Sequence, residues 1–402
     1  ADAVTLGAAV VGTINLGSGD DTLSMGNFAN TVTVLNVETI NGNSNADIVT
    51  LGNQITSGSI NLAAGADRLI LGNFDNTVTL SNVESVVGGS SSDIVTLATA
   101  AVSGTNINLG AGSDTLVLGN FVNTLTISNV ETLTGSNSAD LVTYATQISG
   151  STIDLGGGND VLTLGNFANT LTVQNIETVI GNSGADLVTL GTALTGRIDL
   201  GAGSDVLTLG DFNNNITVNN VESILGGTGN DVITIGAAQT AGAINLGDGS
   251  DTLNFGTFNT TLTVMNVETI NGGSGSEFIT LGTQITGGTI NLGAGADRLT
   301  LGNFVNTLTV SNIESVMGGA TNDTVTLGSS ITGGSINLGF GNDTLVLGNF
   351  NNTVTVSNVE TLTGNSGNDL ITLGSDYNGA LDLGAGTDRL TLSNGSNNVP
   401  VQ

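Results

Sequence analysis

The stretch of sequence that decides the fold is NLGAGSDTLVLGNF, residues 108–121. A turn with two glycines leads into Asp114, and the apolar residues Leu116 and Leu118 then lie two positions apart. Apolar residues at alternate positions predict a short β-strand with one buried face. The same pattern of a glycine-rich turn, a carboxylate and an apolar strand recurs in residues 15–28, 154–167 and 337–350.

When the chain is aligned on this carboxylate, the pattern occurs 18 times, and 17 of the 18 positions hold Asp. We call these residues the turn carboxylates: Asp2, Asp21, Asp47, Asp67, Asp93, Asp114, Asp140, Asp160, Asp186, Asp205, Asp231, Asp251, Glu277, Asp297, Asp323, Asp343, Asp369 and Asp388. Their spacing alternates between about 20 and about 26 residues, so two of them define a repeat of about 46 residues. Eight repeats with partial ends fill residues 1–392, which we predict to be a single domain. Residues 393–402, which include Pro400, are predicted to be an irregular tail.

Positions around each turn carboxylate also agree from repeat to repeat. The second and fourth residues after it are apolar, as in Leu23 and Met25 after Asp21, and the fifth is nearly always Gly. No repeat can bury its apolar face alone, whereas stacked coils build one continuous core. We therefore predict an all-β parallel β-solenoid (a β-roll or β-helix) of about 17–18 coils, with two coils per repeat. An antiparallel sandwich or barrel is the competing fold, but it does not require the columns to agree at 18 positions.

Each repeat contains two segments that differ in sequence, and each segment holds about three predicted short strands. In the A segment the turn opens with Leu-Gly, as at Leu109-Gly110, and a Phe follows once per repeat. We predict that these Phe side chains form a stacked ladder in the core: Phe28, Phe74, Phe121, Phe167, Phe212, Phe258, Phe304 and Phe350.

The composition excludes several classes of function. The chain has 34 acidic residues against four Arg, no Lys, no Cys and no His, and its formal net charge is −30. Such a charge argues against binding nucleic acid, whose phosphates require Lys and Arg. It favours a hard divalent cation bound through oxygen ligands. No run of 18 apolar residues is present, so we predict no membrane-spanning helix.

Stacking the turn carboxylates would place like charges close together. Equivalent residues of neighbouring coils lie about 4.8 Å apart, where two carboxylates repel by about 3 kcal/mol at an effective dielectric constant near 20. Four arginines cannot neutralise such a column. The glycine-rich turns expose backbone carbonyls, and carbonyl and carboxylate oxygens are the ligands that Ca²⁺ prefers. The alternative is that each Asp only accepts N–H groups of its turn and stays solvated.

The segment GGTGNDVIT, residues 226–234, resembles one repeat of the RTX (repeats-in-toxin, haemolysin-type) calcium-binding family. The resemblance implies a right-handed parallel β-roll whose turns bind several Ca²⁺ ions between adjacent coils. It implies that Asp231 is a ligand and that Gly226, Gly227 and Gly229 form its turn. GGSGSEF at 272–278 is similar, with Glu277 in place of Asp. We extend this prediction to all 18 turn carboxylates as metal ligands.

The sequence also departs from the RTX pattern. RTX repeats follow one another every nine residues and place ions on both edges of the roll, whereas here the motif occurs once per predicted coil. The turn that ends at Asp140, GSNSAD, has also lost a glycine. We therefore expect one calcium-binding edge.

A second acidic column is formed by Asn-Val-Glu or Asn-Ile-Glu, which occurs once in each of eight repeats. Its glutamates are Glu38, Glu84, Glu131, Glu177, Glu222, Glu268, Glu314 and Glu360. One interpretation is that each Glu accepts a turn N–H while the Asn side chains stack as an amide ladder. The other is a second cation site or a cation-bridged lateral contact.

These observations predict a secreted, calcium-binding structural protein: a rigid rod within an extracellular filament, surface layer or matrix. We expect self-association, and we expect Ala1-Asp2 to mark a processed N-terminus or the edge of a longer array. An adhesin stalk is an alternative. Outward threonines such as Thr124 and Thr126 suggest another alternative, an ice-binding solenoid. We predict no enzymatic activity, because no cluster of catalytic side chains interrupts the repeat.

Overall fold

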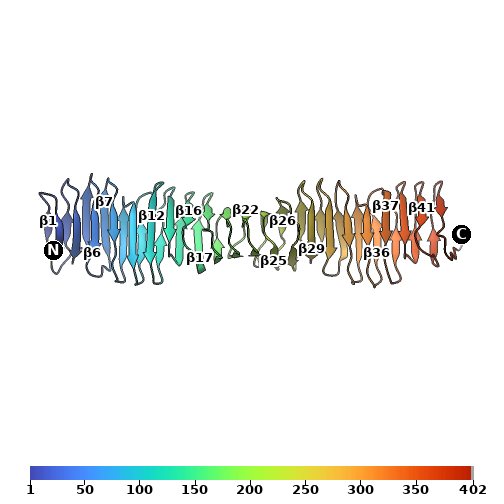
Figure 1. Cartoon of the computed structure of the whole chain (residues 1–402), viewed down its shortest axis with the longest axis horizontal. Helices are drawn as coiled ribbons and strands as arrows, with labels where there is room; N and C mark the ends of the chain where they lie inside the picture. The colour runs from blue at the N-terminus through green and yellow to red at the C-terminus, as the bar shows by residue number, and fades with distance from the viewer. Residues whose placement is uncertain (400–402) are drawn as a thin grey trace. The chain divides into compact units, whose positions relative to one another are not determined.

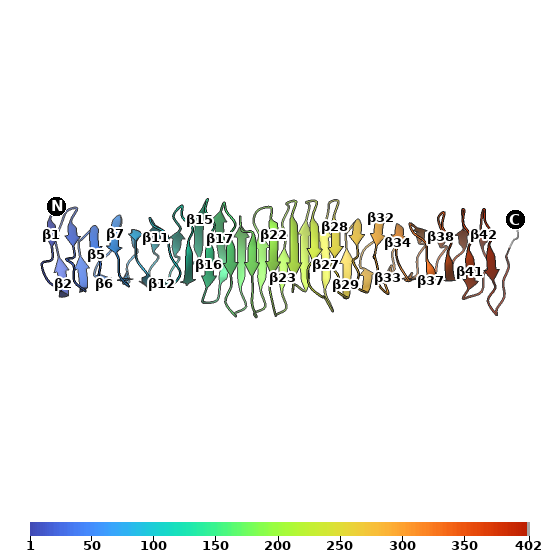
Figure 2. The ribbon, with the colours of Figure 1, turned by 90° about the horizontal axis from the view of Figure 1, so that it is seen from above.

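The computed structural model describes residues 1–399 and divides the chain into two compact units, Ala1–Asp205 and Val206–Gln402. Within the described residues there are 43 strands and no helix, and hence no helix long enough to cross a membrane. In each unit the strands alternate along the chain between two parallel sheets (Figures 1 and 2). The predicted all-β parallel β-solenoid is confirmed.

The first unit contains strands β1 to β22. Its odd-numbered strands form one sheet: β1 (Ala3–Thr5), β3 (Thr22–Ser24), β5 (Thr39–Asn43), β7 (Gly58–Ala63), β9 (Thr77–Ser81), β11 (Ile94–Leu97), β13 (Thr115–Val117), β15 (Thr132–Ser136), β17 (Ser149–Gly156), β19 (Thr170–Gln174) and β21 (Leu187–Leu190). Its even-numbered strands form the other: β2 (Val11–Asn15), β4 (Thr31–Leu35), β6 (Ile48–Leu51), β8 (Arg68–Ile70), β10 (Ser85–Gly89), β12 (Thr105–Gly110), β14 (Thr124–Ser128), β16 (Leu141–Tyr144), β18 (Val161–Thr163), β20 (Thr178–Ile180) and β22 (Thr195–Asp199).

The second unit continues the numbering with the same alternation. Its odd-numbered strands are β23 (Val206–Thr208), β25 (Ser223–Gly227), β27 (Ala243–Gly247), β29 (Thr260–Met265), β31 (Glu277–Leu281), β33 (Arg298–Thr300), β35 (Ser315–Met317), β37 (Thr332–Asn337), β39 (Thr353–Ser357), β41 (Leu370–Leu373) and β43 (Arg389–Thr391). Its even-numbered strands are β24 (Asn215–Asn219), β26 (Val232–Ile235), β28 (Thr252–Phe255), β30 (Thr269–Asn271), β32 (Thr286–Asn291), β34 (Thr307–Ser311), β36 (Thr324–Leu327), β38 (Thr344–Val346), β40 (Thr361–Thr363) and β42 (Ala380–Asp382). Described residues beyond β43 carry no strand, and Pro400 lies outside the described part of the chain.

Alternation of side chains along each strand builds the core. In β13, Leu116 is fully buried, while Thr115 and Val117 on either side of it are partly exposed. Parallel pairing stacks Leu116 on Val95 of β11 and on Leu133 of β15. Burying one such aliphatic side chain contributes about 1.5–3 kcal/mol, and the stack continues through each unit. The apolar spacing of the repeat therefore fixes the register of each coil against the next.

The 46-residue repeat does not correspond to two coils. Thr31 in β4 and Thr77 in β9 are equivalent residues 46 positions apart, so one repeat advances the chain by five strands. Because two strands make one coil, a repeat advances the solenoid by two and a half coils. Each repeat holds five strands instead of about six, and the coils are somewhat more numerous than expected. Equivalent residues of successive repeats consequently lie in opposite sheets.

The predicted core ladder of Phe side chains is wrong. Phe121 lies in a turn and is 42% exposed, and Phe28, Phe167 and Phe258 are exposed to a similar extent. The half-integral advance explains this, because successive phenylalanines fall at opposite edges and cannot stack. The Phe121 N–H donates to the Gly119 carbonyl at 2.8 Å. A Cβ added at Gly119 would lie 2.5 Å from the Leu97 carbonyl oxygen and 2.9 Å from the Phe121 ring, which explains the glycine at this position of the A segment.

Candidate metal-binding turns

In each unit the turns lie along two edges, which we name by the strands that the turns enter. Turns at the odd edge lead into odd-numbered strands, and turns at the even edge lead into even-numbered strands. Asp93 and Asp114 precede β11 and β13 at the odd edge, whereas Asp140 and Asp160 precede β16 and β18 at the even edge. Both edges therefore carry turn carboxylates, and the expected single edge is wrong.

The turn carboxylates occur in nine pairs that alternate between the edges. Pairs at the odd edge are Asp2/Asp21, Asp93/Asp114, Asp186/Asp205, Glu277/Asp297 and Asp369/Asp388. Pairs at the even edge are Asp47/Asp67, Asp140/Asp160, Asp231/Asp251 and Asp323/Asp343. The two members of a pair lie in adjacent coils, and the backbones of adjacent coils are about 4.8 Å apart. Along one edge of the first unit, the next pair follows five coils later, so the expected unbroken column of 18 charges does not form.

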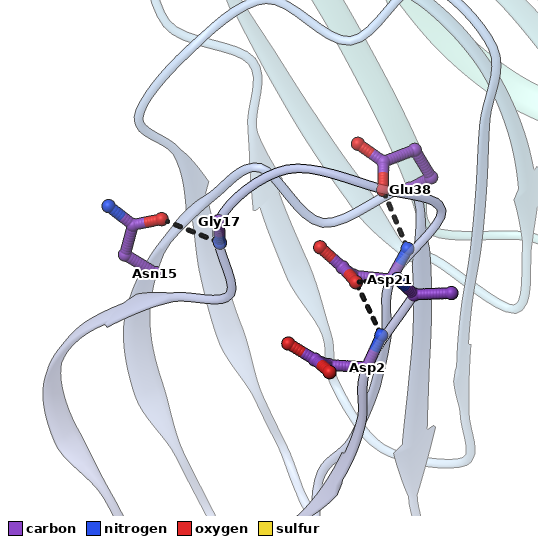
Figure 3. A network of polar contacts seen from close by, with 6 residues as sticks. Asp2, Asn15, Gly17, Asp21 and Glu38 are labelled. Carbon is purple, nitrogen blue, oxygen red and sulfur yellow. Dashed lines mark hydrogen bonds and ion pairs between the residues drawn. The ribbon is translucent and has the colours of Figure 1, made fainter.

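A chain of hydrogen bonds joins each pair to its neighbours along the edge. The Asp93 N–H donates to Oδ1 of Asp114 at 2.7 Å, and the Asp114 N–H donates to Oε2 of Glu131 at 2.8 Å. Figure 3 shows the same arrangement at the first pair, where Asp2 donates to Asp21 and Asp21 donates to Glu38. One carboxylate oxygen of each acceptor is therefore engaged by the backbone of the preceding coil.

The Asn-Val/Ile-Glu motif takes part in this ladder. The N–H of the preceding turn carboxylate donates at 2.8–2.9 Å to these glutamates of the motif: Glu38, Glu84, Glu131, Glu177, Glu268, Glu314 and Glu360. The interpretation that Glu accepts a turn N–H is confirmed. The motif Asn does not form a continuous ladder: Asn129 donates to Asn108 of the preceding coil and adopts a φ of 53° that suits a tight turn.

Sequence reasoning missed a buried polar residue in the coil before eight of the nine pairs. Asn76 precedes β9 as Asp93 precedes β11, is 1% exposed, and donates its N–H and its Nδ2 to Oδ1 of Asp93 at 3.0 and 2.9 Å. Equivalent residues are Asn30, Asn123, Asn169, Asn214, Thr260, Asn306 and Asn352. Two features of the sequence could have identified these residues. Each is followed two and four residues later by apolar residues, as Asn76 is by Val78 and Leu80, and each lies 17 residues before the next turn carboxylate.

The second oxygen of most turn carboxylates is buried without a hydrogen bond. Among the described residues, Oδ2 has no partner in Asp21, Asp47, Asp67, Asp93, Asp114, Asp140, Asp160, Asp186, Asp231, Asp251, Asp297, Asp323, Asp343 and Asp369. These side chains are at most 2% exposed. A buried carboxylate oxygen without a partner is costly, so a pair of two such Asp residues presents two oxygens that a cation could satisfy.

Burial makes the ionised form of these groups unfavourable. Burial, opposed by the hydrogen bond from the Asp93 N–H and assisted by the charges of Glu131 and Asp93, raises the pKa of Asp114 to about 6. Burial likewise raises the pKa of Asp67 and of Asp160 to about 6. For Glu277, burial, the charge of Asp297 and a side-chain contact with Asp297 raise the pKa to about 7. Without a cation, these carboxyls therefore hold their protons more tightly than carboxyls in water do.

Backbone carbonyls point into the layer between paired turns. A Cβ added at Gly110, where φ is +94°, would lie 2.1 Å from the carbonyl oxygen of Gly89. One at Gly112 would lie 2.8 Å from that of Ser91. Glycine therefore permits the close approach of one turn to the carbonyls of the preceding turn. The Gly89 carbonyl accepts the Ala111 N–H at 2.8 Å. No group of three or more acidic side chains that could hold a metal is present in residues 1–399, so a bound ion would need carbonyls of the turns as further ligands.

Carboxylate oxygens without partners, turn carbonyls and high negative charge together fit Ca²⁺, which takes six to eight oxygen ligands. The fold and these turns define the class: a parallel β-solenoid with cation-binding turns. The family model of the RTX calcium-binding nonapeptide repeat matches residues 151–171, 218–234, 335–354 and 357–376. These segments contain Asp160, Asp231, Asp343 and Asp369, respectively.

The four matches and the parallel β-solenoid fit an RTX-repeat protein, which confirms the resemblance drawn from residues 226–234. Repeats of this kind imply that the chain binds Ca²⁺. No curated protein matches the chain.

Proposed function

We propose that the protein is a secreted structural protein whose solenoid is stiffened by calcium, and that it serves in an extracellular filament, surface layer or matrix. The observation that supports this most is the set of paired, buried turn carboxylates whose second oxygens have no partner among the described residues. Extracellular fluids supply millimolar Ca²⁺ that fills weak sites. In a cytosol with little free Ca²⁺, the buried charges would remain uncompensated.

All 18 turn carboxylates are proposed as ligands, with one ion between the two turns of each pair. The test is the calcium content of the purified chain after dialysis against millimolar Ca²⁺, with magnesium as the control. We expect about one ion per pair. A chain that binds no calcium under these conditions would contradict the proposal.

Self-association is the second part of this proposal. Outer faces of the sheets are rich in hydroxyl side chains, and Asp20, Asp75, Asp211 and Asp248 are exposed in turns. Exposed carboxylates at the edges can be bridged laterally by calcium ions. Light scattering with and without millimolar Ca²⁺ tests this step: we expect assemblies that chelation reverses. A chain that stays monomeric at high concentration in Ca²⁺ favours an adhesin stalk instead.

Ice binding is the second candidate function, favoured by one row of threonines. Thr115, Thr132, Thr152, Thr172 and Thr189 pair in register across β13, β15, β17, β19 and β21. The neighbouring row, however, contains Val117, Asp154 and Gln174, so the two rows do not form a uniform hydroxyl array. Thermal hysteresis at millimolar protein concentration would establish this function.

We also propose that the chain is not an enzyme. The chain has two Tyr and four Arg as candidates for catalytic side chains. Tyr144 is 1% exposed in the core, and its hydroxyl donates to the Val130 carbonyl at 3.3 Å. Arg68 and Arg298 each begin a strand and lie exposed on the outer faces of the sheets. Assays on extracellular polysaccharides, where β-solenoid lyases act, would test this proposal.

A further inference from the structure

One of the nine pairs differs chemically from the rest. Glu277 stands where the other 17 turn carboxylates are Asp. In the preceding coil, Thr260 stands where the seven equivalent residues are Asn. One coil earlier, Gln239 is 4% exposed at a position that is Ile55 or another aliphatic residue in most repeats. Three neighbouring coils of the odd edge in the second unit thus depart together from the pattern.

The departure changes which oxygens are available. Elsewhere Asn donates two hydrogen bonds to the carboxylate, but the Thr260 N–H donates to the Ser276 carbonyl at 3.1 Å. Glu277 keeps the link within the pair, because its N–H donates to Oδ1 of Asp297 at 2.8 Å. Among the described residues, neither Oε1 nor Oε2 of Glu277 has a hydrogen-bond partner, and Oδ2 of Asp297 has none either. Apart from the side-chain contact between these two carboxyls, this pair presents three carboxylate oxygens to a cation, whereas an Asp–Asp pair presents two.

The two substitutions compensate each other sterically. Glu is one methylene longer than Asp, and Thr has one heavy atom fewer than Asn, so the buried volume is nearly conserved. Both side chains remain buried, at 0% exposed for Glu277 and 2% for Thr260. Thr260 also offers no amide N–H to the carboxylate.

The following turn lies close to the carbonyls of Glu277's turn. A Cβ added at Gly293 would lie 2.2 Å from the Gly273 carbonyl oxygen, and one at Gly295 would lie 1.9 Å from that of Gly275. These carbonyls therefore face the turn of Asp297, and that of Gly273 accepts the Ala294 N–H at 2.9 Å.

We propose that the Glu277–Asp297 pair is a distinct calcium site in which Glu277 is a bidentate ligand, and that it fills first. The inference rests on the proposed calcium binding of the turns. Ca²⁺ accepts bidentate carboxylates at 2.3–2.6 Å in a flexible shell of six to eight oxygens, whereas Mg²⁺ demands a compact octahedron. An additional carboxylate oxygen therefore favours Ca²⁺ over Mg²⁺ at this pair more strongly than at the Asp–Asp pairs.

The test is a calcium titration of the full chain in excess magnesium, with bound calcium measured by flow dialysis. The wild-type chain is compared with a double variant. We expect the wild-type chain to bind one ion on the order of tenfold more tightly than the others. Thr260→Asn combined with Glu277→Asp restores the common pattern, so the tight ion should join the weaker class while the total number of ions stays the same. Circular dichroism in calcium checks that this variant is folded.

A matched control builds the same chemistry elsewhere. Asn306→Thr combined with Asp323→Glu converts the Asp323–Asp343 pair of the same unit, and we expect it to create a second tight ion. The inference is overturned if all ions of the wild-type chain form one affinity class, or if the restored variant keeps its tight ion. Those results leave calcium binding intact, whereas a chain without bound calcium overturns the proposed function as well.

Discussion

Asn76 and Asp93 occupy equivalent places in adjacent coils, have nearly the same shape, and differ in how completely they are bonded. The oxygen of Asn76 accepts the Ile55 N–H at 3.0 Å, and its amide nitrogen donates to Asp93 and to the Phe74 carbonyl. Asp93 accepts from Asn76 with Oδ1, but its buried Oδ2 has no partner within residues 1–399. Both residues are almost fully buried.

The comparison shows that the ladder itself does not require a charge. A neutral amide closes the same hydrogen bonds and leaves no buried group unsatisfied, which is the less costly arrangement. Paired Asp in the two following coils must therefore be explained by something else. A cation shared by the two free oxygens explains why acids occur in pairs at these coils, and why Asn occupies the coil before them.

Removing calcium should have the largest effect. A ligand at 100 times its dissociation constant stabilises the folded state by about 2.7 kcal/mol per site, and each unit holds several pairs. We expect a chelator such as EGTA to lower the melting temperature sharply and to weaken the β signal in circular dichroism, without unfolding the chain completely at low temperature. Restoring calcium should reverse both changes, and magnesium should do so poorly. Spectra and melting curves that chelation leaves unchanged would contradict calcium binding by the turns.

Lowering the pH should stabilise the metal-free chain and destabilise the calcium-loaded chain. Asp67, Asp114 and Asp160 have folded-state pKa values of about 6 without metal, above the ordinary value of 3.8. The folded state then binds more protons than the unfolded state, so the stabilisation is complete below pH ~4 and is lost as pH rises through ~6. The metal-free chain should melt higher at pH ~5 than at pH ~7.5, and the calcium-loaded chain lower, because protons compete for the ligands. Equal pH responses of the two forms would refute this assignment.

The substitution Asn76→Asp should place a third carboxylate at the odd edge, in the coil before Asp93. Without calcium, the variant adds a buried carboxylate beside Asp93 and removes the amide donor, which costs about 3 kcal/mol. With calcium, most of that loss should be recovered, because the introduced carboxylate and the one of Asp93 can share an additional ion. Thermal melts in chelator and in calcium measure the difference. The equivalent change Asn123→Asp at the even edge is the matched control and should behave in the same way.

The solenoid, the inward apolar columns and the glycine turns were predictable from sequence, because Leu116 and Leu118 recur at fixed distances from Asp114. The two-and-a-half-coil advance was not recognised, because the turn before β9 has Phe74 and Asn76 where the motif has Gly and Asp. Because one turn carboxylate was counted per coil, two repeats were expected to hold four coils, whereas they hold five. The alternation of edges followed from that missed coil, and so did the pairing of the carboxylates.

Asp231→Asn tests the charge without breaking the ladder. Oδ1 of an amide still accepts from Asn214, which donates to this position at 2.9 Å through both N–H and Nδ2. The variant should lose about one ion per chain, and its stability in chelator should change by less than about 1 kcal/mol. Asp231→Ala removes the acceptor as well and should cost about 1–3 kcal/mol even in chelator. If the two variants are equally unstable in chelator, the Asp is needed for the ladder and not for the ion.

Thr234→Ala should have the smallest effect, and it separates the outer face from the edge. Thr234 lies three residues after Asp231 in β26, points away from the core and pairs in register with Thr217 and Asn254. The substitution removes a partly exposed hydroxyl and a methyl group without touching the ladder, so its cost should stay below about 0.5 kcal/mol. Calcium content should not change, and the melting temperature should shift equally in calcium and in chelator. A loss of bound calcium in this variant would show that the outer rows and the turns do not act independently.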